Sequence, residues 1–296
     1  MGDDAVFCQR VADGLNGIVI DVDYAKAPEL AFPHANLDID AVLAWLQDGD
    51  QKDDATKQTI SISKAFEIKG KHFPIRIESN NVALTGFSSG GNLVLTACVR
   101  AKQRKELNRI VAVASFYPST NLSESPYKKP NVKPEKGASG GVLPPSLREF
   151  FYSCYVPLEK HIQIREEQTF PLRSSSAISP LYAKFDEFPQ SVTIITCSGD
   201  SLAREGKQMA EHIVAGRSLS SQIDFIGQTV DPPIGVPDVN RIPIQQSIEQ
   251  NGVIWWEAKG QGHAWDKLIK PGSEPEKLRD EAYELVITRL RSAFGL

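Results

Sequence analysis

The chain has 296 residues, of which 41% are hydrophobic and 24% are charged, and its formal net charge is −4. This composition allows a full buried core in one domain, and the small negative charge argues against nucleic acid or an anionic membrane as the main partner. No apolar run is long enough to suggest a transmembrane helix, so we expect no membrane insertion.

The first predicted elements are a helix, a strand and a second helix. Apolar residues recur at helical spacing over Asp3 to Leu15, and Asn16-Gly17 is a typical helix stop. Ile18 to Tyr24 is short and mostly apolar, which predicts a strand. Leu37 to Leu46 carries an apolar stripe opposite acidic and polar residues, so we expect a helix that covers the sheet.

A strand, a tight turn and a helix follow. Residues 48–57 are predicted to form a surface loop, and residues 66–75 lead into a strand over Val82 to Thr85. The turn is Gly86 to Gly91, with the sequence GFSSGG, and Asn92 to Arg100 is apolar on nearly every face. The pattern G-x-S-x-G between a strand and a helix is typical of a nucleophile elbow, whose glycines permit the sharp turn that exposes the central serine.

Ser88 is therefore the candidate nucleophile, although an isolated match to this pattern also fits an ordinary turn. A serine hydroxyl needs a base, and the base needs an acid that orients it. In such sites the chain order is serine, acid, histidine. Asp200 follows a predicted strand over Ser191 to Cys197, and His263 follows one over Val253 to Ala258. Both lie past the carboxyl ends of strands, where open α/β sheets bind ligands.

Each of these assignments has a simpler alternative. Asp200 also suits the N-cap of the helix that begins near Leu202, and His263 is one of five histidines and could lie in a surface loop. The order of the residues and their places at strand ends favour a triad, with Ser88 as nucleophile, His263 as base and Asp200 as orienting acid. The backbone N–H of Ser89 is then the predictable oxyanion donor.

The stretch between nucleophile and acid adds a strand and a long insertion. Ile110 to Phe116 predicts a buried strand, and prolines punctuate the polar stretch at 119–145. Its glycine-rich segment, residues 137–141, is interpreted as a mobile loop because it lacks the context of a phosphate-binding loop. Residues 147–156 are rich in aromatic side chains, which would pack the insertion onto the main body, line a pocket, or do both.

The last third of the chain contains a second insertion and a closing helix. The helix after the candidate acid is predicted to stop near Gly216, and residues 217–251 form an extra, proline-bearing loop. Trp255 and Trp256 are adjacent on a strand, so their side chains should face opposite ways. Glu276 to Leu290 predicts an amphipathic helix.

Several blocks of the sequence carry a family pattern. The blocks are DYAKAPE at 23–29 with FPHA at 32–35, GFSSGGNL at 86–93, SPL at 179–181, GDSLAREG at 199–206, and Gly262-His263. They resemble, in register, the DYRLAPE and FPA, GDSAGGNL, SPL, DPLRDEG and catalytic histidine segments of the α/β-hydrolase fold-3 family, the hormone-sensitive-lipase-like carboxylesterases and lipases.

The resemblance implies an α/β-hydrolase fold: a mostly parallel central sheet flanked by helices, in a single domain over residues 1–296. Residues 119–178 would form a partial cap over the active site. The sequence departs from the family pattern at Phe87, where an acidic residue is usual, at Ser89, where alanine is usual, and at Arg204, where aspartate is common.

The family's HGGG segment, which supplies most of the oxyanion hole, does not occur before Asp23. In the family, the strand that carries it lies between the counterpart of Ile18 to Tyr24 and the elbow strand. We therefore expect N-terminal strands to be missing and a gap in the middle of the sheet. A start codon placed too late and a decayed or repurposed hydrolase both remain open.

The expected function is a serine hydrolase that cleaves small apolar carboxylic esters through Ser88, His263, Asp200 and an acyl-enzyme, with no cofactor and no metal. The alternative is a catalytically impaired or non-catalytic relative that binds a small molecule, as the gibberellin receptors do by analogy. Acyl transfer or lyase chemistry on the same triad also stays open, as does a homodimer. The four scattered cysteines lack metal-ligand spacing, which favours reduced thiols and a cytoplasmic protein.

Overall fold

The computed structural model describes residues 4–48, 81–157, 172–226, 247–267 and 269–296. Within these residues the core is one five-stranded sheet in the order β1-β2-β3-β5-β4. The strands are β1 (Val82–Phe87), β2 (Ile110–Phe116), β3 (Ser191–Cys197), β4 (Ser247–Gln250) and β5 (Val253–Ala258). All neighbouring pairs are parallel except β4 and β5, which are antiparallel. The parallel strands therefore end at one edge of the sheet, and the loops that follow them meet there.

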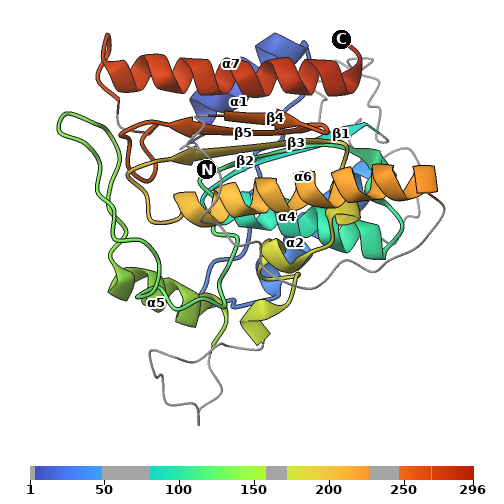
Figure 1. Cartoon of the computed structure of the whole chain (residues 1–296), viewed down its shortest axis with the longest axis horizontal. Helices are drawn as coiled ribbons and strands as arrows, with labels where there is room; N and C mark the ends of the chain where they lie inside the picture. The colour runs from blue at the N-terminus through green and yellow to red at the C-terminus, as the bar shows by residue number, and fades with distance from the viewer. Residues whose placement is uncertain (1–3, 49–80, 158–171, 227–246, 268) are drawn as a thin grey trace, which may run out of the picture.

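Helices cover both faces of this sheet (Figure 1). α1 (Ala5–Leu15) and α7 (Glu274–Phe294) lie on one face, and α2 (His34–Asp48), α4 (Ser89–Gln103) and α6 (Ala203–Ile226) lie on the other. Two large apolar clusters fill the layers, one under α1 and α7 and one under α4 and α6. The central strands β2 and β3 are buried along nearly their whole length, as expected for parallel strands covered on both sides. The architecture is the predicted one, a mostly parallel central sheet flanked by helices.

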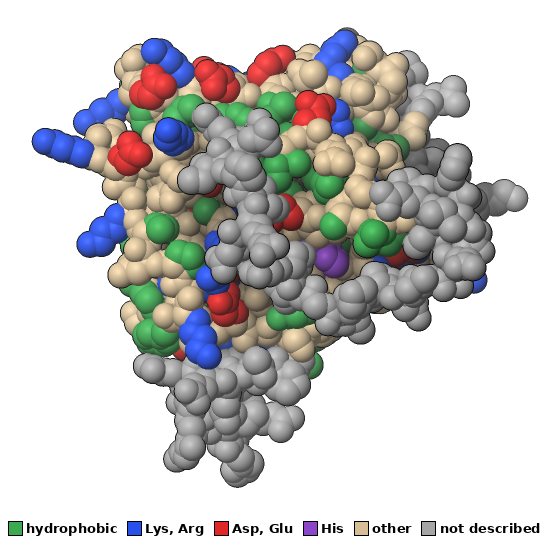
Figure 2. Space-filling view, in the orientation of Figure 1, with side chains coloured by type: hydrophobic (Ala, Val, Ile, Leu, Met, Phe, Trp, Pro, Cys, Tyr) green, Lys and Arg blue, Asp and Glu red, His purple; other side chains and the backbone are tan. Residues whose placement is uncertain are grey.

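The remaining elements belong to the connections. α5 (Pro145–Tyr155) lies away from the sheet, at the lower left of Figure 1. Four short 3₁₀ helices complete the described elements: η1 (Leu107–Arg109), η2 (Leu172–Ser174), η3 (Pro180–Tyr182) and η4 (Phe185–Glu187). No helix among the described residues has an apolar stretch long enough to cross a bilayer. Acidic and basic side chains are interspersed on the face shown in Figure 2, without a field of one sign.

Most predicted elements are present, and two are wrong. Ile18 to Tyr24 is extended but is not a strand, because no described strand pairs with it. The predicted stop at Gly216 is also wrong, because α6 continues to Ile226. The ring of Phe185 lies where a side chain at position 216 would be, with Cδ1 only 2.4 Å from an added Cβ. Gly216 therefore serves helix packing and not helix termination.

The second insertion, predicted as a loop over 217–251, is partly regular structure. Residues 217–226 extend α6 and residues 247–250 form β4, while 227–246 lie outside the described residues. The predicted segments at 49–57, 66–75 and 158–171 lie outside them as well. The opposite orientation of the adjacent tryptophans is confirmed, since Trp255 packs in the cluster under α6 and Trp256 packs against the one under α7.

Candidate active site

Ser88 occupies the turn between β1 and α4. Its backbone has φ 52° and ψ −113°, outside the usual regions for a residue with a side chain, and such strain is typical of functional turns. Two glycines make the turn possible. A Cβ at Gly86 would lie 2.3 Å from the carbonyl oxygen of Gly90, and one at Gly91 would lie 2.6 Å from Ser115 Oγ. The turn thus holds the Ser88 side chain at the carboxyl edge of the sheet.

Three side chains from three separate loops form one hydrogen-bonded chain at this edge. Ser88 Oγ lies 2.8 Å from His263 Nε2, and His263 Nδ1 lies 2.7 Å from Asp200 Oδ2. The loops follow β1, β5 and β3, respectively. The Asp200 side chain is 1% exposed and that of His263 is 10% exposed. The arrangement couples a hydroxyl to an imidazole, and that imidazole to a buried carboxylate.

The Asp200 carboxylate has a second partner. The backbone N–H of Leu202 donates to Oδ1 over 3.1 Å, while Oδ2 faces His263. Asp200 therefore contacts both the start of the next helix and the imidazole. Its interpretation as a helix N-cap and its interpretation as the orienting acid do not exclude each other. Cys197 lies beside it, and burial together with the Asp200 charge raises the pKa of that thiol well above its ordinary value.

Ser89 is the first residue of α4. The backbone N–H groups in the first turn of a helix have no carbonyl partner within the helix. The Ser89 N–H is therefore suited to bind a negatively charged oxygen. The Ser89 hydroxyl lies 2.8 Å from the hydroxyl of Tyr24, at the end of the extended segment 18–24. The segment predicted as a strand thus reaches the elbow through a side-chain hydrogen bond.

A buried aspartate behind the histidine was missed in the sequence. Asp266 accepts hydrogen bonds from Tyr117 Oη over 2.6 Å and from Tyr283 Oη over 2.7 Å, and Lys267 Nζ lies 3.0 Å away. The Tyr117 ring packs edge-on against the His263 ring, with 4.9 Å between centroids. Burial and the Asp266 charge raise the pKa of Tyr117, which therefore stays a neutral donor. The only sequence signal for Asp266 was its position three residues after the candidate base His263.

Phe87, the departure from the family pattern beside the nucleophile, belongs to an aromatic cluster. Its ring stacks on Phe116 at 4.4 Å and meets Phe7 edge-on at 5.1 Å. The ammonium of Lys267 lies 3.5 Å from the ring centre. The face of an aromatic ring attracts a cation, so Phe87 and Lys267 stabilise each other beside the nucleophile.

A buried ion pair ties the first insertion to α6. Lys129 is fully buried, forms an ion pair with Glu205 and donates to Tyr152 Oη over 2.7 Å. Glu205 Oε1 also accepts the backbone N–H of Thr120 over 2.8 Å. Burial disfavours the charged lysine, but the Glu205 carboxylate outweighs this effect and raises the pKa of Lys129. The pair therefore holds the insertion to α6 at Glu205, which lies five residues after Asp200 in sequence.

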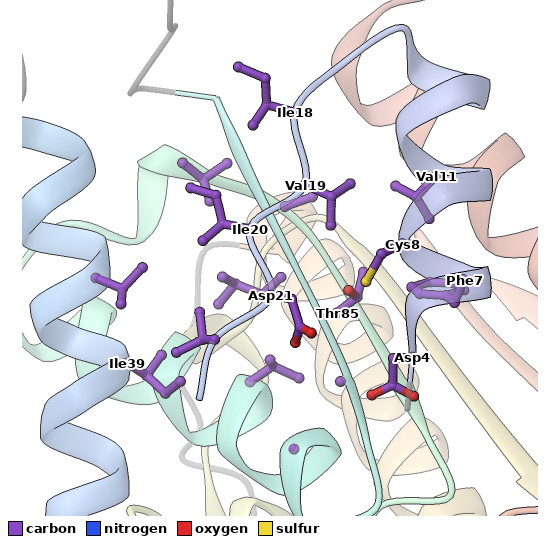
Figure 3. Close-up of a pocket in the computed structure, with 18 of the residues that line it drawn as sticks. Asp4, Phe7, Cys8, Val11, Ile18, Val19, Ile20, Asp21, Ile39 and Thr85 are labelled. Atoms are coloured by element: carbon purple, nitrogen blue, oxygen red, sulfur yellow. The ribbon is translucent and has the colours of Figure 1, made fainter. Parts of the chain in front are cut away.

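An apolar cavity of about 330 Å³ lies beside the elbow strand. Figure 3 shows that residues 18–21 run along one side of it and β1 along the other, with Phe7, Cys8 and Val11 of α1 at a third side. The expected absence of a strand between segment 18–24 and the elbow strand stays a prediction, because residues 49–80 lie outside the described residues. Because β1 borders this cavity, five of its six residues are half-buried, whereas six of the seven residues of β2 are buried.

The glycine-rich segment predicted to be a mobile loop is held by backbone hydrogen bonds. Gly141 N–H donates to His263 O over 2.8 Å, and His263 N–H donates to Gly141 O over 2.9 Å. Gly262 N–H donates to Ser139 O over 2.9 Å. The segment therefore packs on the histidine loop, a pairing of distant residues that local composition does not reveal.

Among the described residues, no group of three or more histidine, cysteine, aspartate or glutamate side chains is placed to hold a metal ion. All four cysteines are free thiols, and Cys98 and Cys197 are buried.

Comparison with known proteins identifies a family and several similar esterases. The family described as alpha/beta hydrolase fold matches residues 2–228. The chain is 27% identical over 156 residues to 3-O-acetylpapaveroxine carboxylesterase CXE2 of Papaver somniferum, a match that covers 51% of this chain and 44% of that protein. The chain thus spans less than half the length of this curated relative.

Solved esterases share the fold. The Pyrobaculum calidifontis esterase aligns with a TM-score of 0.62 and 19% identity, covering 98% of this chain and 70% of its own. EstE1, a thermostable carboxylesterase cloned from a metagenomic library, aligns with a TM-score of 0.61 and 20% identity, covering 98% and 74%. With the family match over more than three quarters of its length, this chain belongs to the α/β-hydrolase fold family, whose matched members are carboxylesterases.

Proposed function

We propose that this protein is a serine hydrolase that cleaves small apolar carboxylic esters. The observation that carries the proposal is the unbroken chain from Ser88 Oγ through His263 to the buried Asp200 carboxylate, with 2.8 and 2.7 Å contacts. A serine hydroxyl in this setting becomes a nucleophile because a neighbouring imidazole can take its proton.

In the proposed acylation step, Ser88 Oγ attacks the ester carbonyl carbon while its proton passes to His263 Nε2. Asp200 Oδ2 accepts the hydrogen bond from His263 Nδ1–H and stabilises the imidazolium that forms. The negative oxygen of the tetrahedral intermediate faces the Ser89 N–H at the start of α4. His263 then protonates the leaving alcohol, which departs as the carbonyl re-forms.

In the deacylation step, water attacks the acyl-enzyme while His263 takes one of its protons. Collapse of the second tetrahedral intermediate returns the proton to Ser88 and releases the carboxylic acid. The balance is one ester and one water giving one acid and one alcohol, so no cofactor is required. The free thiols support a reducing compartment such as the cytoplasm.

The test is hydrolysis of p-nitrophenyl butyrate by the purified chain, together with labelling by a fluorophosphonate. We expect Ser88→Ala to lower kcat at least about a thousandfold and to abolish labelling. Ser220→Ala, on α6, is the matched control and should retain both. Labelling and turnover that persist in Ser88→Ala would overturn the proposal. Tight ligand binding without turnover in the folded wild type would instead favour the non-catalytic binding protein.

A further inference from the structure

The glycine strap, which we define as residues 139–141, packs on the histidine loop. Gly141 of the strap forms an isolated antiparallel bridge with His263, which joins the histidine loop to the first insertion. The Gly141 and His263 backbones exchange both of their hydrogen bonds, at 2.8 and 2.9 Å. The Ser139 N–H donates in addition to the side-chain oxygen of Gln261 over 2.9 Å. The backbone N–H and C=O of His263 are thus both bonded to the strap, and the imidazole of the same residue faces Ser88.

The strap approaches the histidine loop so closely that glycine is required on both sides. Gly140 has φ +88°, and a Cβ there would lie 2.5 Å from Gly262 O and 2.8 Å from His263 O. A Cβ at Gly262 would lie 2.5 Å from Pro134 Cγ and 2.7 Å from Gly141 O. No side chain fits between the two segments, so the hydrogen bonds depend on these glycines.

Buried side chains hold the insertion on both sides of the strap in sequence. Upstream, the buried Lys129 is held by Glu205, by Tyr152 Oη and by the carbonyl of Asn121. Downstream, Arg148 of α5 is buried and donates to Pro126 O over 2.9 Å. The strap is therefore held on both sides and can fix the position of the histidine loop.

We propose that the glycine strap positions His263 for proton transfer, so that Gly140 is a positioning residue of the active site. This inference rests on the proposed hydrolase function. The strap does not touch the reacting atoms; it fixes the backbone from which the imidazole projects. Proton transfer depends on the distance between Ser88 Oγ and His263 Nε2, and a misplacement of about 1 Å can cost a hundredfold in rate.

Gly140→Ala tests the proposal, with Gly137→Ala as matched control. Gly137 has nearly the same backbone conformation, φ +85°, but a Cβ there meets nothing within 4 Å. The two variants thus share the strain of a left-handed alanine and differ in the clash with the histidine loop. We expect Gly140→Ala to lower kcat for p-nitrophenyl butyrate about 10- to 100-fold with KM changed less than about threefold. Gly137→Ala should keep kcat within about twofold of the wild type.

A second readout does not need turnover. The proton shared by His263 Nδ1 and Asp200 Oδ2 should give a far-downfield proton NMR signal in the wild type, identified by its loss in Asp200→Ala. Gly140→Ala should shift or broaden this signal, and Gly137→Ala should leave it unchanged. If the wild type shows no esterase activity, the proposed function fails, while this signal still tests the strap. A folded Gly140→Ala with wild-type kcat and an unchanged signal would overturn the inference.

A milder variant covers the case in which Gly140→Ala does not fold. Gln261→Met removes the side-chain acceptor of the Ser139 N–H without inserting an atom between the segments. We expect it to lower kcat several-fold and to broaden the same NMR signal, with unchanged KM. Wild-type kcat and an unaltered signal in folded Gln261→Met would then count against a positioning role.

Discussion

The ammonium of Lys267 lies 3.5 Å from the centre of the Phe87 ring, so a cation covers the residue that immediately precedes Ser88. The same ammonium forms ion pairs with Asp266 and with Asp4 of the segment that begins α1. One side chain thereby connects the elbow strand, the histidine loop and the N-terminal helix.

We expect Lys267→Met to lower the free energy of unfolding by about 1–3 kcal/mol, because it removes a half-buried cation from an aromatic face and from two carboxylates. Urea unfolding followed by tryptophan fluorescence measures the change. Lys277→Met is the control, since Lys277 pairs with Glu274 on the exposed side of α7 and both side chains are about two-thirds exposed. Equal effects of the two substitutions would show that the contacts of Lys267 add nothing.

The buried pair of Lys129 and Glu205 should be the most sensitive charged site of the insertion. Glu205→Gln leaves the lysine charge buried without its counterion, so we expect a loss of about 3–5 kcal/mol. Replacing the pair together, by Lys129→Met and Glu205→Gln, should cost less than Glu205→Gln alone. Chemical unfolding of the three proteins measures this, with Lys102→Met at a half-exposed surface pair as control. A double variant that is less stable than Glu205→Gln would contradict the argument.

A pH-dependent contribution to stability is expected from Cys98. Burial raises the pKa of this thiol from 9.0 to about 12, so the folded state keeps a proton that the unfolded chain releases. The contribution is complete below pH 9 and is lost as pH rises toward 12, by about 1.4 kcal/mol per pH unit.

The measurement is urea unfolding of the wild type and Cys98→Ala from pH 8 to pH 10.5. The variant should be less stable at pH 8, because it leaves a small cavity, but its stability should fall less steeply above pH 9. Val99→Ala, in the same apolar cluster, should lower stability without changing the slope. Parallel curves for wild type and Cys98→Ala would show that the thiol does not titrate differently in the folded state.

Gly86 and Gly90 of the elbow should differ sharply in how well they tolerate substitution by alanine. Gly86→Ala would place Cβ 2.3 Å from Gly90 O, so we expect a loss of about 3 kcal/mol or more, and a lower melting temperature. Gly90→Ala meets nothing within 4 Å and should leave the melting temperature nearly unchanged. Calorimetry on both variants measures the change in melting temperature. A stable Gly86→Ala would mean that the turn relaxes more easily than its geometry implies.

The four parallel strands of the sheet were predictable from sequence, because each of them and its following loop carry local signals. The boundaries of β2, β3 and β5 agree with the predicted runs, since continuous apolar segments bounded by polar turns are characteristic of buried parallel strands. The candidate site was predictable for the same reason: Ser88, Asp200 and His263 follow such strands, and parallel strands end at a common edge.

The features that sequence reasoning missed depend on contacts between distant segments. Gly216 has the signature of a helix stop, but the Phe185 ring that packs on it lies 31 positions earlier in the chain. Ile18 to Tyr24 has the composition of a strand, but pairing and not composition defines one. The strap has the composition of a loose loop, and only its partner, the backbone of His263, gives it order.

The cavity beside β1 has a consequence for the behaviour of the protein in concentrated solution. Within the described residues, β1 pairs only with β2 and has an apolar sequence, VALTGF, without proline or charge. Such a strand edge is a template on which another chain can add by hydrogen bonding. Residues 18–22 line the cavity together with β1, so this extended segment shields the strand that leads to Ser88 from pairing with a second chain.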